Sequence, residues 1–204
     1  MMNKIIKHLL PLFIVQFFTW IALFSLWIYA TPVITKYVFN TTDSESGAFE
    51  NGVTWVAICF AFYATLAALL AFIIPNLLKH ITKSKLHAVA LFIGSVGLLL
   101  IFFIQQKYLL FISFACIGIA WSSISNIPYL IISDIAPSNK ITTYFAVFNF
   151  SVVIPQITSA FFLGYICKNS FKGETNYIML LGAASMFLAG ILMFFAYTKK
   201  LEKE

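Results

Sequence analysis

Amide and aromatic side chains occur in parts of this sequence that are otherwise apolar. Gln16 and Trp20 are one helical turn apart, and Asn149 and Gln156, in the stretch "FNFSVVIPQ", are two turns apart. Asn126 and Tyr129 are likewise spaced for one helix face. Amides donate and accept hydrogen bonds, and a flat ring stacks on the C-H face of a sugar. The six side chains therefore predict a site for an uncharged, hydroxylated molecule.

The same residues have a purely structural alternative. Asn, Gln and Ser form hydrogen bonds between transmembrane helices that contribute on the order of 0.6 to 2 kcal/mol each, and Trp20 could be ordinary core packing. For a single serine or threonine, a bond to its own helix or to a neighbouring helix is the favoured interpretation. Pro128 and Pro155 each remove an intrahelical hydrogen bond, so we expect both helices to bend near these amides.

Composition places these residues in a membrane. The chain has 204 residues, of which 61% are hydrophobic and 10% charged, and its mean hydropathy is +0.94. A water-soluble domain could not cover so much apolar surface with so little polar material. The thirteen basic residues are all lysines in short loops and at the ends, which argues against a nucleic-acid partner. We expect a polytopic membrane protein in contact with lipid.

Six apolar stretches are long enough to cross the hydrocarbon layer, which needs about 20 residues. Helix is the expected state because backbone groups in lipid must be satisfied within the segment. The expected spans are Leu9 to Val33, Gly52 to Leu78, Leu86 to Ile104, Tyr108 to Ile132, Thr142 to Ile166 and Tyr177 to Tyr197.

Lysines in the flanking segments predict the orientation. With the N-terminus inside, most lysines lie on the cytoplasmic side, and the loop "NTTDSESGAFEN" is external. We expect a multi-pass protein of a bacterial cell (inner) membrane with both termini cytoplasmic. His8, His80 and His87 are expected at the membrane boundary as orientation charges or solvated side chains.

The six spans divide into two sets of three, over residues 9–104 and 108–197 of one bundle that covers 1–204. An odd number of spans in each set inverts the second set relative to the first, which predicts an inverted repeat. The third and sixth spans hold few polar residues, so we expect them to face lipid. The other four are expected to enclose the polar site.

Nothing in the spans indicates an enzyme. No Ser/His/Asp set, metal-ligand cluster, phosphate loop or carboxylate pair occurs in them. Cys59, Cys116 and Cys167 are isolated and predict neither a disulfide framework nor a metal site. We therefore expect no catalytic residue, no metal and no cofactor.

Three stretches resemble helices of a known transporter family. "QFFTWIALFSLWIYATP" in the first span, "ISNIPYLIISDIAP" ending the fourth and "YFAVFNFSVVIPQ" in the fifth resemble helices seven, ten and eleven of major-facilitator sugar symporters. The most similar groups are the glycoside-pentoside-hexuronide and the sucrose/maltose:proton symporters. The resemblance covers essentially the whole chain in order, although the loop "KHITKSK" lacks the glycine and arginines of the family's loop motif.

This resemblance implies an all-α integral membrane protein that is the C-terminal half, helices seven to twelve, of a twelve-helix fold. The substrate of such a protein lies between two six-helix bundles, so an N-terminal half is the implied partner. Proton coupling is expected from that missing half, because no ionisable group is expected at membrane depth here. Two alternatives remain open: a half-size transporter that pairs with a second copy, and a structural membrane subunit that does not transport.

Overall fold

The computed structural model describes the backbone of residues 2–201 and the side-chain surroundings of residues 5, 6 and 9–195. Helix is the only regular secondary structure in this part of the chain. The helices are α1 (Met2–Tyr37), α2 (Gly47–Ala71), α3 (Ile74–Leu77), α4 (Lys83–Phe103), α5 (Leu110–Ile135), α6 (Ile141–Asn169) and α7 (Asn176–Leu201). Short 3-10 turns at Lys107–Leu109 and Ser138–Lys140 precede α5 and α6.

Six of these helices are long and apolar enough to cross a bilayer, which confirms the six predicted spans. Only α3, a single turn after α2, is too short. Helix α1 continues through Pro11 and Pro32, which both lie inside it. Helices α5 and α6 likewise continue past Pro128 and Pro155. Interior prolines are tolerated in membrane helices because neighbouring groups satisfy the freed carbonyls.

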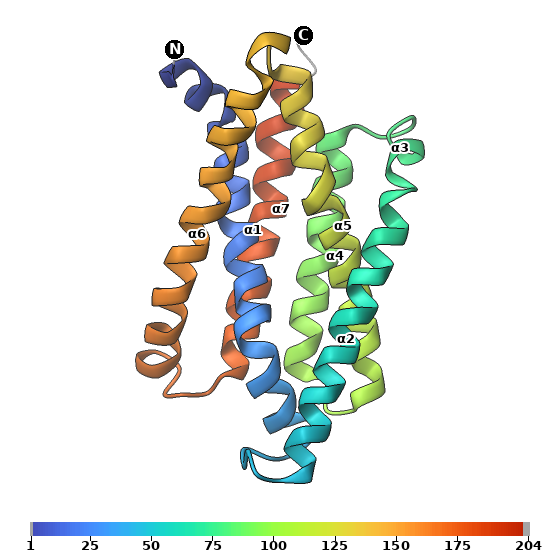
Figure 1. Ribbon diagram of the computed structural model, residues 1–204, viewed down its shortest axis with the longest axis vertical. Helices are drawn as coiled ribbons and strands as arrows, with labels where there is room; N and C mark the ends of the chain where they lie inside the picture. The colour runs from blue at the N-terminus through green and yellow to red at the C-terminus, as the bar shows by residue number, and fades with distance from the viewer. Residues whose placement is uncertain (1, 202–204) are drawn as a thin grey trace.

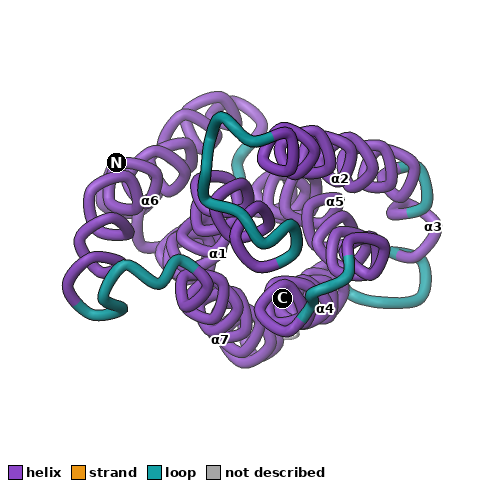
Figure 2. Tube along the Cα trace, turned by 90° about the horizontal axis from the view of Figure 1, so that it is seen from below, coloured by secondary structure: helices purple, strands orange, loops and turns teal. Residues whose placement is uncertain are grey.

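The helices pack in pairs related by the predicted inverted repeat. The contact of α4 with α5 corresponds to that of α7 with α1. The contact of α2 with α5 corresponds to that of α6 with α1. Helices α4 and α7, which correspond to each other, are also in contact. The end-on view shows α6 and α2 on opposite flanks of the bundle (Figure 2). Both termini lie at the same end (Figure 1), called here the terminal end, and the α1–α2 and α6–α7 loops lie at the other, called the loop end.

That the third and sixth spans, α4 and α7, face lipid stays a prediction. Helices α4 and α7 each keep an exposed apolar strip, but α2 and α6 are the least buried of the spans. Glycines account for the close packing: a Cβ built at Gly94 would lie 2.4 Å from Ala120 Cβ, and one at Gly97 2.6 Å from the Ser113 carbonyl oxygen. Helices poor in polar residues can thus pack closely on their neighbours when small residues let the backbones approach.

Ion pairs join helices at both ends of the bundle. At the terminal end, Lys83 Nζ at the start of α4 lies 2.5 Å from Asp134 Oδ2 near the end of α5. At the loop end, Lys36 Nζ lies 2.7 Å from Glu174 Oε2 in the α6–α7 loop, and the Tyr37 hydroxyl donates to the same oxygen. Lys36 first, and then Tyr37, lower the pKa of the Glu174 carboxyl below its ordinary value.

Replacing Gly94 with Ala should destabilise the bundle, because the new methyl group would overlap Ala120 Cβ at 2.4 Å. Overpacking of this kind costs typically about 1 to 3 kcal/mol, which outweighs the usual gain of about 0.5 to 1 kcal/mol for Gly to Ala in a helix. Gly164→Ala on α6 is the matched control, since its Cβ would meet nothing within 4 Å. Thermal melting of both variants in lipid nanodiscs checks this, and equal melting temperatures would contradict it.

Acid should release the α6–α7 loop from α1. A carboxyl whose pKa is lowered by its partners keeps the contact above its ordinary pKa and loses it as the pH falls through the lowered value. The protection of backbone amides in residues 170–175, measured as the hydrogen–deuterium exchange rate relative to the intrinsic rate at each pH, should therefore fall at acid pH, and at neutral pH in Glu174→Gln. Global melting should change little because the pair is partly exposed. Glu45→Gln, in the α1–α2 loop, is the control. If residues 170–175 exchange as slowly in Glu174→Gln as in Glu45→Gln, the pair of Lys36 and Glu174 does not hold the α6–α7 loop.

Candidate functional site

Three tryptophans form a cluster between α1 and α5. The ring centroids of Trp20 and Trp27, two turns apart on α1, lie 6.2 Å and 5.6 Å from that of Trp121 on α5, and 5.9 Å from each other. All three pairs meet edge to face, a favoured arrangement for aromatic rings. Trp27 Nε1 also donates to the Tyr63 hydroxyl of α2 at 3.3 Å. The tryptophan cluster (Trp20, Trp27 and Trp121) therefore connects three of the four helices expected to enclose the site.

Two polar atoms beside this cluster have no hydrogen-bond partner. Trp20 Nε1 is a buried donor and Gln16 Oε1 a buried acceptor, and Gln16 as a whole is only 1% exposed. The two residues are one helical turn apart, so both atoms belong to the same stretch of α1. Most buried polar groups in proteins are paired, and an exception calls for a functional or structural reason. A water molecule or a hydroxylated ligand would supply the missing partners.

The predicted pair on α5 has a mixed environment. Asn126 Nδ2 donates to the Ser122 carbonyl of its own helix at 2.8 Å, which leaves the amide oxygen for another donor. The exposed ring of Tyr129 lies 5.7 Å from Phe145 and 5.3 Å from Phe148 of α6. Tyr129 thus bridges α5 and α6 next to Asn149.

The predicted pair on α6 lies further out. Asn149 is exposed and Gln156 half-buried, whereas Pro155 between them is buried. Trp20 therefore contacts α5 and Tyr129 contacts α6, whereas Asn149 lies on an exposed face of α6. This chain alone does not wrap around all six predicted residues.

Three hydroxyl groups in the spans follow the structural alternative, whereas those of Ser113, Ser122 and Ser159 are buried without a partner. Thr19 donates to the Val15 carbonyl and Thr158 to the Ile154 carbonyl, both at 2.9 Å. Ser151 donates to the Phe148 carbonyl at 2.6 Å. For these residues the predicted back-bonding is confirmed, so they carry no argument for ligand binding.

Trp121 and His87 are the residues that the sequence interpretation missed or misplaced. Trp121 lies inside a span, and the reasoning applied to Trp20 would have found it. His87 was expected at the membrane boundary, but it is 0% exposed, with Nδ1 2.8 Å from the Ser123 hydroxyl of α5. That expectation was wrong because α4 packs on α5 and the ring is buried against Ser123. His80 is exposed, as expected, and the His8 side chain lies outside the described part.

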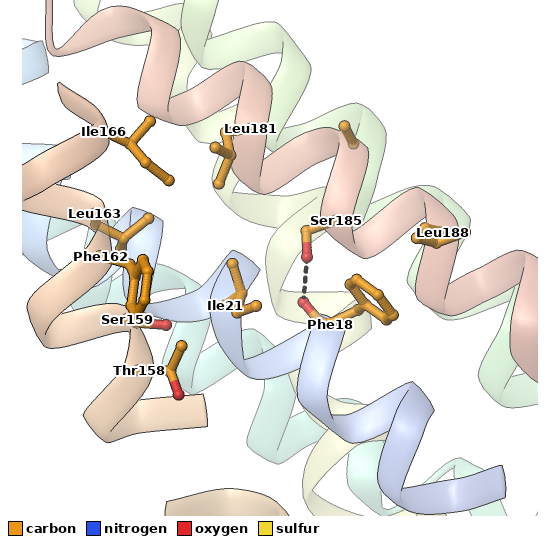
Figure 3. A pocket seen from close by; sticks show the side chains of 11 residues that line it. Phe18, Ile21, Thr158, Ser159, Phe162, Leu163, Ile166, Leu181, Ser185 and Leu188 are labelled. Carbon is orange, nitrogen blue, oxygen red and sulfur yellow. Dashed lines mark hydrogen bonds between the residues drawn. The ribbon is translucent and has the colours of Figure 1, made fainter. Parts of the chain in front are cut away.

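A cavity of about 410 Å³ lies elsewhere, between α1, α6 and α7 (Figure 3). Its walls are mostly apolar, with Thr158, Ser159 and Ser185 as the polar exceptions. The Ser185 hydroxyl is occupied, since it donates to the Phe18 carbonyl at 2.8 Å. Such walls do not suit a sugar, and none of the six predicted site residues lines this cavity.

Ionisable residues in the described part of the chain form no group of three or more that could hold a metal ion. Cys59, Cys116 and Cys167 are all free thiols. The tryptophan cluster and Gln16 offer hydrogen bonding and aromatic contact.

Comparison with known proteins identifies the family. The family model described as Major Facilitator Superfamily matches residues 2–160, which are 159 of the 204 residues. No curated protein matched the chain. The matched range includes both helices of the tryptophan cluster and most of α6. A multi-pass helical bundle of this family contacts lipid and a small-molecule substrate. The chain belongs to the Major Facilitator Superfamily of membrane transporters.

Proposed function

We propose that this chain is the C-terminal half of a sugar:proton symporter for a glycoside such as sucrose or maltose. It acts with an N-terminal six-helix half, which supplies the second wall of the substrate site and the proton coupling. In this proposal the chain is one six-helix bundle with repeats at about 9–104 and 108–197, set in a bacterial inner membrane with both termini cytoplasmic.

The observation that carries this proposal is the pair of unpartnered atoms beside the tryptophan cluster. Gln16 Oε1 accepts and Trp20 Nε1 donates, so together they match a sugar hydroxyl, which does both. The aromatic faces nearby suit the C-H face of a sugar ring. No charged side chain of α1 lies between Leu9 and Thr35, which favours an uncharged substrate.

The uncovered face of the bundle supports a missing partner half. Helices α2 and α6 are the least buried spans, and Asn149 of α6 is exposed. Ser125 and Tyr129 are exposed on α5, whereas the exposed strips of α4 and α7 are apolar. An amide in lipid would lack partners, so the polar face suits a cavity shared with a second bundle. We propose Asn126, Tyr129, Asn149 and Gln156 as further substrate contacts.

Replacing Gln16 or Trp20 with Ala should weaken disaccharide binding. For Gln16→Ala, the affinity should change more than the melting temperature does. Loss of one hydrogen bond to the ligand costs roughly 1 to 3 kcal/mol, or about 5- to 150-fold in affinity. Gln16 Oε1 has no partner within the chain, so its removal breaks no internal bond at that atom. Sucrose and maltose affinities should be measured by tryptophan fluorescence with the chain assembled with an N-terminal half, and melting temperatures recorded in parallel.

Asn149→Ala and Gln156→Ala should fall in the same affinity range. Ser95→Ala is the control, because its hydroxyl donates to the Phe92 carbonyl of its own helix at 2.7 Å. Near-native affinity together with clearly lowered melting temperatures in the four site variants would mean that these side chains only hold helices together. That result would overturn the site.

Cysteine labelling tests the orientation. Ser44 in the α1–α2 loop and His80 before α4 are both exposed and lie at opposite ends of the bundle. A membrane-impermeant thiol reagent added to intact cells should label Ser44→Cys but not His80→Cys. The unmodified chain measures the background, since Cys59 and Cys167 are buried and Cys116 half-buried. Strong external labelling at position 80 would reverse the orientation.

A further inference from the structure

The cavity of about 410 Å³ between α1, α6 and α7 has no part in the proposed sugar site (Figure 3). It opens at the surface of the bundle, because Phe162 of α6 and Leu188 of α7, which both line it, are 59% and 38% exposed. Helices α6 and α7 hardly touch each other and are joined mainly through α1. The space is therefore a crevice between two helices that is open to the surroundings of the protein.

The wall of this cavity offers a ligand almost no polar group. The hydroxyls of Thr158 and Ser185 donate to backbone carbonyls at 2.9 and 2.8 Å, so their protons are already used. Ser159 is 1% exposed, and its hydroxyl oxygen is buried. The other lining residues are all apolar. Apolar cavities stay dry and take up apolar molecules, so the chemistry of the wall suits a hydrocarbon.

The depth of the cavity matches one leaflet of a bilayer. On α7 its lining residues run from Leu181 to Leu188, five to twelve residues after Asn176, where the helix begins at the loop end. At a rise of about 1.5 Å per residue they lie about 8 to 18 Å from that end, and the hydrocarbon of one leaflet is about 15 Å deep. Tyr177 is exposed at the same end, where aromatic residues commonly mark the polar boundary of a membrane. An acyl chain of the loop-end leaflet therefore reaches the cavity.

The polar face proposed for a second bundle lies on another side of α6. Gln156 belongs to that face and Phe162 to the cavity, and because they are six residues apart they point about 120° apart around the helix. On α1, Trp20 contacts Trp121 of α5, whereas Phe18 lines the cavity. A partner half on the polar face would therefore leave the cavity beside lipid.

We propose that the cavity between α1, α6 and α7 is a binding site for one acyl chain of a membrane phospholipid from the leaflet at the loop end. The chain enters between α6 and α7 and packs on Phe18 and Ile21 of α1. It supplies the apolar contacts that α6 and α7 do not make with each other, and so it holds α6 in place against the bundle. This site goes beyond the proposed sugar binding, since it uses none of the six proposed substrate contacts.

A photoactivatable phospholipid tests this site. Phosphatidylcholine that carries a diazirine midway along one acyl chain is included in nanodiscs with the full chain, and the protein is transferred into detergent before irradiation. Detergent removes lipid that only touches the surface, whereas a chain held in the cavity should remain. Labels located by mass spectrometry should therefore persist between Leu181 and Leu188 and disappear from Ile58, which is exposed at a similar depth on α2.

Leu181→Trp should abolish the persistent label, because the larger side chain fills the cavity. Leu180→Trp is the matched control and should keep the label, since this adjacent half-buried residue lines a different groove, between α4 and α7. If Leu181→Trp does not fold, Leu188→Trp decides in its place.

A label that washes out of residues 181–188 as it does from Ile58, or that persists in the deciding variant, would overturn the proposal. A dimer whose cavity is unlabelled would also overturn it, and would assign the cavity to a second copy of the chain. Sugar affinity is not measured in this experiment, so the lipid site and the sugar site can fail independently.

Discussion

The close approach of α4 to α5 and α7 is the contact on which the rest of the bundle depends. Gly94 and Gly97 leave no room for a side chain against Ala120 and Ser113 of α5, so these two helices meet almost backbone to backbone. Lipid tails are as apolar as leucine, and packing by small residues therefore replaces the hydrophobic effect as the force between helices. Helices α4 and α7 pack on each other, and α2 and α6, on the flanks of the bundle, are the least buried spans.

The same packing determines which polar groups remain unpaired. Hydroxyls of Thr19, Ser151 and Thr158 return to carbonyls of their own helices and need nothing else. Other buried groups stay unpaired: the hydroxyls of Ser113, Ser122 and Ser159 have no partner. Gln16 and Trp20 each keep one unpartnered atom at the tryptophan cluster, and His87 keeps its Nε2. Low surrounding polarity makes each of these atoms costly when it is unpaired. They are accordingly the places where a ligand or water would stabilise the protein most.

The two groups of unpartnered atoms lie on different helices. Gln16 and Trp20 belong to the middle of α1, where their position suits a substrate shared with a second bundle. His87 lies near the start of α4 and Ser123 just past the middle of α5. The ion pair between Lys83 and Asp134 closes the same end of α4 and α5. The tryptophan cluster and the pair of His87 and Ser123 thus lie in separate parts of the bundle.

Six spans and a helical bundle follow from the sequence by itself, because a run of about 20 apolar residues has no other stable state in a bilayer. The sequence also singles out Trp20, Gln16 and the amides, since polar groups inside such runs stand out. Their partners cannot be read from it: that Trp121 completes the cluster, that His87 is covered and that Asn149 stays open all depend on how helices rotate and approach. Those choices rest on contacts between residues distant in the chain, such as Gly94 with Ala120. Spacing along one helix shows which residues share a face, but only the packed bundle decides what that face meets.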